Sequence, residues 1–189
     1  MRKLEKTFEI TSGRLVASDP CYACREGDTR GVRCNIPAQT GTWIAEATCF
    51  DNIETNGWGD RVARLEVVSS EWNKLEDSYE EVEMFVDSGQ WGVFDSDLYP
   101  QGEDTGEYDD PDSFYHKVCH AGDPERSFKF EVIEGLGVVV GSGYGDGGYN
   151  CTLTLNEGKV VKIEIVFIDE YHEEDDYYEE EEEEGNFNW

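Results

Sequence analysis

Residues 149–168 read YNCTLTLNEGKVVKIEIVFI, and this stretch has the pattern of a β-hairpin. Apolar and polar side chains alternate on both sides of a turn sequence, Asn156-Glu-Gly-Lys159. The apolar positions are Tyr149, Cys151, Leu153 and Leu155 before the turn, and Val161, Ile163, Ile165 and Phe167 after it. Because side chains in a strand point alternately to opposite faces, the stretch predicts two antiparallel strands with one buried face.

Most of the chain before this hairpin also has β-type composition. Apolar pairs lie on either side of a Ser-Gly turn at 12–13, and further strands are expected at 42–50 (TWIAEATCF), 61–68 (RVARLEVV), 82–86 (VEMFV) and around 93–94. Helix signals are few. Asp110-Pro111 is typical of a helix start and predicts a short helix around 111–120, with Phe114 and Val118 facing inward. Ser69 or Ser70 is a candidate cap for a second helix in EWNKLEDSYEE.

These signals predict a mainly β domain, an antiparallel sandwich or strongly curved sheet with one or two short helices. We expect residues 1–168 to form this single domain and residues 169–189 to form an acidic tail. Residues 169–184 contain twelve acids and no lysine or arginine, and a run of glutamates favours disorder in isolation.

The net charge is −29, and without residues 169–184 the chain still has 32 acids against 15 bases. Such a protein does not bind nucleic acid through ordinary phosphate contacts, and an anionic membrane repels it. It attracts a basic partner, including a protein that itself binds nucleic acid. The alternative explanation of the charge is solubility alone.

The N-terminus lacks an apolar stretch of signal-peptide length, and no segment is apolar enough to span a membrane. We therefore expect a cytoplasmic protein. In that compartment thiols are the usual state of cysteine, so the six cysteines are expected to be free rather than disulfide-bonded.

Residues 137–149 (GVVVGSGYGDGGY) contain the spacing G-x-G-x-x-G at Gly143, Gly145 and Gly148. A dinucleotide-binding loop of this kind needs a helix directly after it, but here a strand pattern follows, and Asp146 places a negative charge in the loop. The glycines are therefore expected to serve a strand–turn–strand connection. The order Gly-aromatic-Gly-Asp recurs at 57–60, so either the two loops bring Asp60 and Asp146 together or they are two independent turns.

Several segments together resemble those of an uncharacterised family of bacterial and phage proteins, classed as a domain of unknown function. They are SDPCY (18–22), FVDSGQWGVFD (85–95), FYHKVC (114–119), SGYGDGGY (142–149) and GKVVKIEIVFI (158–168). The resemblance covers about residues 10–168. It implies a compact, mainly β domain of bacterial or phage origin, and it supplies no catalytic residues. The acidic tail and the cysteines at 24 and 34 depart from the family pattern.

Two groups of side chains could bind a metal. Cys21 and Cys24 form a C-x-x-C pair, and Cys34 is a further candidate. His116, Cys119 and His120 lie on the predicted helix, and the spacing of the histidines places both on one face, as in zinc sites. Cys119 is also a candidate activated thiolate. The alternative is that these cysteines are ordinary buried or surface thiols.

The second group consists of aspartates at strand ends: Asp60, Asp87, Asp95 and Asp146, with Asp19 nearby in the same role. Clustered carboxylates could bind magnesium or calcium and support hydrolysis. The alternative is that each aspartate satisfies the backbone of its own turn.

The tail combines acids with aromatic side chains, a composition that suits binding to a basic groove. The candidate partner-binding residues are Tyr171, Glu173, Glu174, Asp175, Asp176, Tyr177, Tyr178, Phe187 and Trp189. The function expected from the sequence is therefore a non-enzymatic acidic interaction protein without a cofactor. For a phage protein, the partner would be a host defence or nucleic-acid-binding protein. The alternatives are a solubilising tail, and a metal-dependent hydrolase or metal-binding domain.

Overall fold

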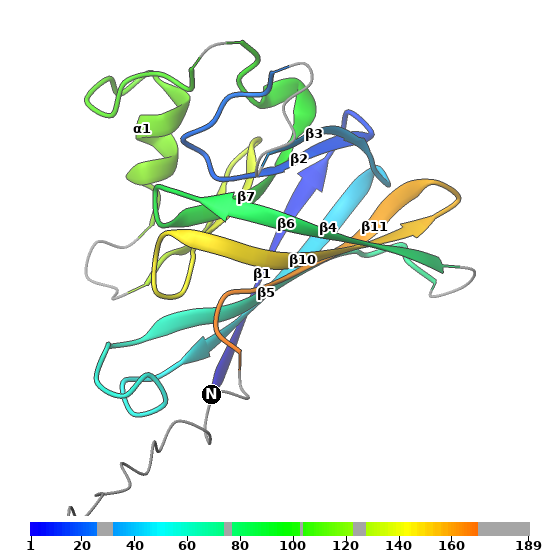
Figure 1. Cartoon of the computed structure of the whole chain (residues 1–189). Coiled ribbons are helices and arrows are strands. Elements are labelled where there is room, and N and C mark those ends of the chain that lie inside the picture. The colour runs from blue at the N-terminus through cyan, green and yellow to red at the C-terminus, as the bar shows by residue number, and fades with distance from the viewer. Residues whose placement is uncertain (26–31, 74–76, 103, 123–127, 170–189) are drawn as a thin grey trace, which may run out of the picture.

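The computed structural model describes residues 1–25, 32–73, 77–102, 104–122 and 128–169. Its strands form two sheets packed face to face, as the sequence predicts (Figure 1). Sheet A contains, in spatial order, β1 (Arg2–Ile10), β4 (Gly41–Phe50), β5 (Arg61–Ser69), β11 (Lys159–Val166), β10 (Gly147–Asn156) and β6 (Asp77–Val86). Sheet B contains β3 (Arg33–Pro37), β2 (Arg14–Ser18), β7 (Gln90–Asp95), β9 (Gly137–Gly141) and β8 (Phe130–Ile133). All neighbouring strands within the two sheets are antiparallel.

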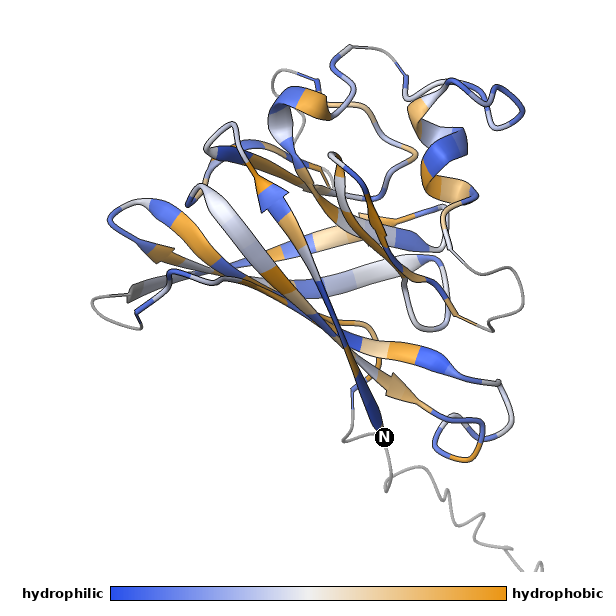
Figure 2. Cartoon of the chain, turned by 180° about the vertical axis from the view of Figure 1, so that it is seen from behind, coloured by the Kyte–Doolittle hydropathy of each residue, from blue (hydrophilic) through white to orange (hydrophobic). Residues whose placement is uncertain are grey.

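The predicted hairpin of residues 149–168 is confirmed as β10 and β11, which occupy the interior of sheet A. Cys151 lies opposite Ile165, and Leu153 lies opposite Ile163; all four side chains are buried. Figure 2 shows the same alternation of hydrophilic and hydrophobic residues along the long strands of this sheet. The period of two in the sequence therefore reflects one face on the core and one face in solvent.

The main core lies between the two sheets. Its largest fully buried side chains include Trp43 and Met84 from sheet A, and Trp91 and Phe130 from sheet B. Large aromatic side chains from both sheets thus interdigitate with aliphatic ones in this space.

A second, smaller core covers the other face of sheet B. The helix α1 (Phe114–Cys119) packs there, with Phe114 and Val118 against Phe94 and Val139 (Figure 1). Sheet B is thus buried on both faces at β9, since Val138 and Val140 face sheet A while Val139 faces α1. This explains why β9 is a continuous apolar run rather than an alternating one.

The helix is shorter than the sequence predicts. Its N-cap is Ser113, whose hydroxyl accepts a hydrogen bond from the His116 amide at 3.0 Å. Asp110, the expected cap, instead accepts from the Asp112 amide in the turn before the helix. The prediction of a second helix in residues 71–81 is wrong for its last part, because strand β6 begins at Asp77. A short 3-10 helix, η1 (Ser96–Leu98), follows β7.

Neither α1 nor η1, the two helical segments of the described residues, has the length and apolar content of a membrane span.

Candidate functional site

Asp19, in the SDPCY segment, is a buried carboxylate that organises a turn. It accepts hydrogen bonds from the Ser88 hydroxyl at 2.6 Å and from the backbone amides of Asp87 and Ser88 at 2.8 and 2.7 Å. It also accepts from the Cys21 amide at 2.8 Å. The carboxylate therefore joins the end of β2 to the β6–β7 turn, and its lone pairs are occupied by the protein itself.

Asp95, at the end of β7, has the same role at the opposite end of the β2–β7 pair. It accepts from the Thr11 amide at 2.6 Å, from the Thr11 hydroxyl at 2.9 Å and from the Ser12 amide at 3.1 Å. Burial opposes ionisation of this carboxyl, but the hydrogen bonds from Ser12 and Thr11 hold its pKa below the ordinary value. Asp95 is therefore an ionised group that stabilises the β1–β2 turn.

The other three loop aspartates do not join a common site. The hydroxyl of Tyr22 donates a hydrogen bond to Asp87. Asp60 lies 3.4 Å from the Arg2 guanidinium, and Asp146 is exposed in the turn after β9. Within the described part of the chain, no group of three or more histidine, cysteine, aspartate or glutamate side chains is arranged to hold a metal ion.

Within the described residues, the cysteine and histidine candidates do not form one metal-binding group. Cys24 forms a disulfide with Cys34, which corrects the expectation that all cysteines are thiols and leaves no free thiolate at Cys24. The chain reverses direction between β2 and β3, and this brings the two Cα atoms to 5.7 Å. The remaining four cysteines, Cys21, Cys49, Cys119 and Cys151, are not disulfide-bonded.

The two histidines share one face of α1, as their spacing predicts, and their rings stack with centroids 3.9 Å apart. Their Nδ1 atoms are engaged by backbone carbonyls, His116 with Tyr108 at 2.6 Å and His120 with His116 at 3.0 Å. Cys119 belongs to another face, where its sulfur accepts from the Gln90 amide at 3.4 Å. Residues 119 and 120 are about 100° apart around the helix, so adjacency in sequence does not bring them together.

Cys21 and Cys119 both lie near Tyr115. Burial raises the pKa of Cys21, and the negative charge of Asp19 raises it further, so this thiol stays protonated at neutral pH. Burial, together with Cys119, raises the pKa of Tyr115 to about 12. The thiol at Cys21 therefore lacks the positive surroundings that activate a nucleophile.

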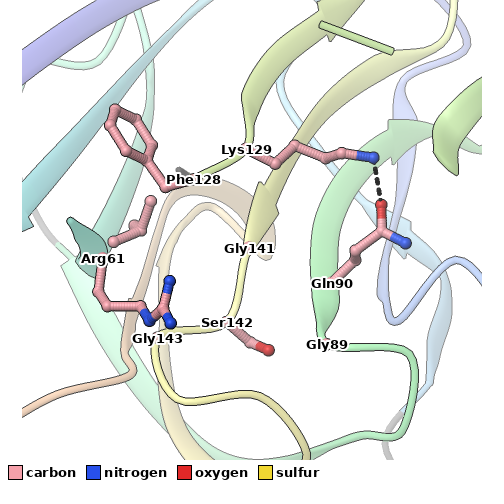
Figure 3. A pocket seen from close by; sticks show the side chains of 9 residues that line it. Arg61, Gly89, Gln90, Phe128, Lys129, Gly141, Ser142 and Gly143 are labelled. Carbon is pink, nitrogen blue, oxygen red and sulfur yellow. Dashed lines mark hydrogen bonds between the residues drawn. The ribbon is translucent and has the colours of Figure 1, made fainter. Parts of the chain in front are cut away.

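A cavity of about 220 Å³ lies beside the glycine-rich turn after β9 (Figure 3). It is lined by Arg61, Val62, Gly89, Gln90, Phe128, Lys129, Gly141, Ser142 and Gly143. Lys129 is fully occupied, because its ammonium donates to Gln90 at 2.6 Å and to the carbonyls of Val118 and Cys119 at 2.7 Å each. This lysine closes the C-terminal end of α1. The cavity is smaller than ordinary ligand pockets.

The glycine-rich turn has a structural explanation. Gly143 has a φ of 59°, and a Cβ atom added to it would lie 2.9 Å from the Cβ of Phe167 and 3.0 Å from the Cγ1 of Ile168. Gly145 also has a positive φ, of 114°. The strand β10 follows directly, so the prediction of a strand–turn–strand connection is confirmed and there is no helix N-terminus for a pyrophosphate.

The two Gly-aromatic-Gly-Asp loops do meet, but through their aromatic residues. The rings of Trp58 and Tyr144 pack edge to face with centroids 5.8 Å apart. Both side chains are largely exposed, Trp58 at 65% and Tyr144 at 53%. We call these two residues the aromatic pair. The repeated order of residues left two alternatives open, a meeting of the loops through Asp60 and Asp146 or two independent turns, and the structure shows a contact through the aromatic rings instead.

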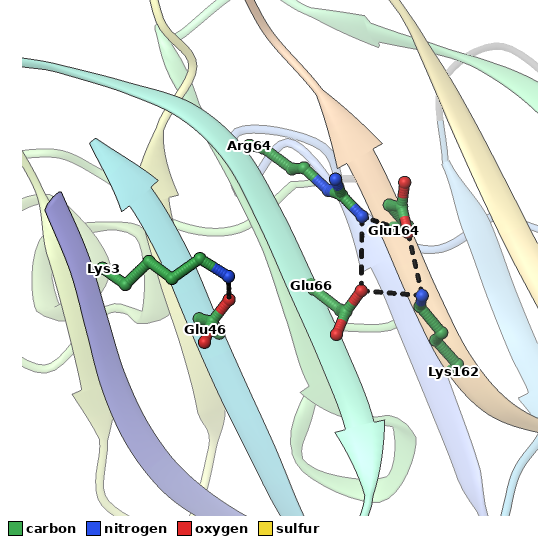
Figure 4. Close-up of polar contacts among 6 residues, drawn as sticks. All are labelled: Lys3, Glu46, Arg64, Glu66, Lys162 and Glu164. Atoms are coloured by element: carbon green, nitrogen blue, oxygen red, sulfur yellow. Dashed lines mark hydrogen bonds and ion pairs between the residues drawn. The ribbon is translucent and has the colours of Figure 1, made fainter. Parts of the chain in front are cut away.

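Positive charges on the solvent face of sheet A are neutralised by neighbouring acids (Figure 4). Lys3 lies 2.6 Å from Glu46, and Lys162 lies 2.7 Å from Glu66. Glu164 lies between two cations, 2.9 Å from Lys162 and 2.8 Å from Arg64. Burial opposes its ionisation, but the hydrogen bonds and charges of Lys162 and Arg64 hold the pKa of Glu164 below its ordinary value.

The acidic loop of residues 97–112 is different. It contains six exposed acids in its described part: Asp97, Asp104, Glu107, Asp109, Asp110 and Asp112. Among the described residues, no lysine or arginine forms a salt bridge with any of them. The loop is nevertheless fixed in place, since the Ser113 hydroxyl donates to the Glu107 carbonyl at 2.6 Å and Lys117 donates to the Asp112 carbonyl at 2.8 Å.

The tail residues that we expected to bind a partner, from Tyr171 to Trp189, lie outside the described residues. The last described residues, Ile168 and Asp169, lie beside the glycine-rich turn, because Ile168 borders Gly143. The acidic segment of the sequence therefore begins close to Tyr144.

Comparison with known proteins adds no assignment. The chain matches no protein-family model, no curated protein and no solved structure. The resemblance to an uncharacterised bacterial and phage family therefore stays a prediction.

Proposed function

We propose that this protein is a non-enzymatic interaction protein that binds a basic partner protein through its negative surface. The observation that carries the proposal is the unequal pairing of its charges. Cations on the face of sheet A are matched by neighbouring carboxylates, whereas the acidic loop presents six exposed acids without a salt bridge among the described residues. A fixed cluster of unpaired charges on the surface creates a potential that steers an oppositely charged protein.

The position of the loop supports this interpretation. The loop lies next to α1 and is held by hydrogen bonds from Ser113 and Lys117, so its carboxylates do not have to be ordered when a partner binds. The acids of residues 169–184 add further negative charge. Within this proposal, the partner is a bacterial nucleic-acid-binding or defence protein in the cytoplasm. Its basic groove normally holds phosphates.

The metal-dependent alternative has no comparable support. Cys24 is bonded to Cys34, and Asp95 accepts hydrogen bonds from the β1–β2 turn. These groups have structural roles that account for their positions in the sequence.

The test compares two triple variants that remove the same charge. The first, Glu107→Gln with Asp109→Asn and Asp112→Asn, changes the acidic loop. The second, Glu5→Gln with Glu134→Gln and Glu157→Gln, changes exposed acids elsewhere. Each variant, the full chain and a chain ending at Ile168 are immobilised, and bacterial lysate is passed over them at low and moderate salt.

We expect basic proteins to be retained by the full chain at low salt and released as the salt concentration rises. The loop variant should lose more of them than the control variant. Retention that is insensitive to salt, or equal loss in the two triple variants, would contradict binding through the acidic loop. The chain ending at Ile168 shows how much of the retention depends on the tail.

A further inference from the structure

The loop between β4 and β5, residues 51–60, displays apolar side chains instead of burying them. Ile53 is 87% exposed and Trp58 is 65% exposed, whereas the polar Thr55 in the same loop is buried. The loop thus exposes two large apolar side chains among polar residues that also face water, such as Asn52 and Asn56. Single exposed apolar side chains are ordinary, but apolar side chains that gather at one place on the surface mark an interaction site.

Hydrogen bonds within the loop fix its conformation. The carboxylate of Asp51 accepts from the amides of Ile53 and Glu54 at 2.8 and 3.0 Å. The Thr55 hydroxyl donates to the Gly59 carbonyl at 2.7 Å, and the Gly59 amide donates to the Asn52 side chain at 2.9 Å. Trp58 is therefore held on a prearranged turn, which reduces the entropy lost when it binds a partner.

The turn that carries Tyr144 is fixed in a similar way. The Ser142 hydroxyl donates to the Gly145 carbonyl at 2.8 Å, and the Tyr149 hydroxyl donates to the same carbonyl at 2.6 Å. Two rigid turns, distant in sequence, thus place Trp58 and Tyr144 in edge-to-face contact at the surface. Rigid, exposed aromatic rings of this kind are the commonest anchors in protein interfaces.

We propose that the aromatic pair, Trp58 and Tyr144, is the docking point for an arginine side chain of the basic partner. This inference rests on the proposed function, since it names the point at which the negatively charged protein holds its partner. An arginine guanidinium stacks on an aromatic face and donates several hydrogen bonds in one plane, which an ammonium does not. Asp146 follows Tyr144 by two residues and is exposed, so the same turn offers the guanidinium a carboxylate.

The negative charge of the protein favours arginine over the other groups that could bind the aromatic pair. A second copy of the chain would bring a net charge of −29 against another −29. Nucleic-acid bases also stack on aromatic rings, but their phosphates would approach the exposed Asp146 and a chain whose net charge is −29. A cationic segment is attracted by the same negative charges that repel a second copy of the chain and a nucleic acid.

The experiment measures binding of two fluorescent peptides, one of alternating arginine and glycine and one of alternating lysine and glycine, at low salt and at about physiological ionic strength. The full chain is compared with Trp58→Ala, Tyr144→Ala and the control Tyr79→Ala. Tyr79 is 70% exposed on the edge strand β6. Tyr79→Ala therefore also removes an exposed aromatic ring, but one that is not part of the aromatic pair. The Trp58→Phe variant keeps a ring and should retain most of the binding.

We expect the arginine peptide to bind more tightly than the lysine peptide. Each alanine variant of the aromatic pair should lower the affinity for the arginine peptide by at least about tenfold. Tyr79→Ala should change this affinity by less than about twofold. Unchanged affinity in both variants of the aromatic pair would overturn the docking point but leave the proposed function intact. Equal weakening by Tyr79→Ala would also overturn it. Failure of the full chain to bind either peptide at low salt would contradict the proposed function as well.

Discussion

Asp19 and Asp95 lie at opposite ends of the antiparallel strands β2 and β7, and each carboxylate binds the turn that precedes the partner strand. Asp19 follows β2 and accepts from the β6–β7 turn, while Asp95 ends β7 and accepts from the β1–β2 turn. The two acids therefore fix both ends of one strand pair. Both turns also connect sheet A to sheet B, so these hydrogen bonds join the two layers of the sandwich.

Replacing Asp95 with asparagine should destabilise the fold by about 1–3 kcal/mol, measured as the free energy of unfolding in urea. One carboxylate oxygen accepts from Thr11 and Ser12, and the other accepts from the Asp97 amide at 3.1 Å. An amide side chain has only one accepting oxygen, so it must present its own NH₂ group to a backbone N–H on one side. The control Asp146→Asn changes an exposed carboxylate, and we expect its effect to stay below about 0.5 kcal/mol.

The contribution of Asp95 should also depend on pH. Its pKa is lowered in the folded protein, so its stabilising effect is present above the ordinary aspartate pKa of about 4 and is lost as the pH falls through the folded value. The difference in unfolding free energy between the wild type and Asp95→Asn should therefore be largest at neutral pH and shrink towards pH 3 or below. A difference that grows as the pH falls would show that Asp95 is not ionised in the folded protein.

The parts of the fold that the sequence predicts are those with one face in the core and one in water. The hairpin of β10 and β11 is the clearest, because its period of two extends over both strands. By contrast, β3 and β8 were missed. β3 is an edge strand with no fully buried residue, and β8 has only four residues, so neither contains a long alternating pattern. The strand β6 was predicted too short, since exposed acids at its edge position, such as Glu80 and Glu81, resemble a helical surface.

The candidate sites were harder to predict, because they depend on which way side chains point. Sequence spacing correctly placed His116 and His120 on one face of α1, but it could not show that Cys119 faces Gln90 instead. The repeat at 57–60 and 143–146 allowed either a meeting of the two loops through Asp60 and Asp146 or two independent turns. Only the structure shows that Trp58 and Tyr144 make the contact.

Reduction of the Cys24–Cys34 disulfide should lower stability by about 3 kcal/mol, the value expected from chain entropy for a loop of this length. The bond links the end of the SDPCY loop to β3, which is an edge strand and has few other contacts to hold it. The measurement is thermal unfolding with and without a reductant. A Cys24→Ser, Cys34→Ser variant is the control, since a reductant should not change its melting temperature. Equal melting temperatures of the oxidised and reduced wild type would contradict the prediction.

The turn after β9 offers a test of why its glycines are needed. Gly143→Ala adds a methyl group that meets the Phe167 side chain at 2.9 Å in a residue whose φ is 59°. Strain in the left-handed region and the close contact together should destabilise the protein by about 2–4 kcal/mol. The control is Gly158→Ala in the β10–β11 turn, where φ is 75° but no atom lies within 4 Å of the added carbon.

Both substitutions impose backbone strain, so the difference between them isolates the contact with Phe167. We expect Gly143→Ala to cost at least about 1 kcal/mol more than Gly158→Ala in urea unfolding. It should also displace Tyr144, the next residue. The affinity for the arginine peptide should therefore fall about as much as in Tyr144→Ala. Equal costs for the two alanine variants would mean that β11 can move away from the turn. The close packing of Gly143 would then not be what holds Tyr144 against Trp58.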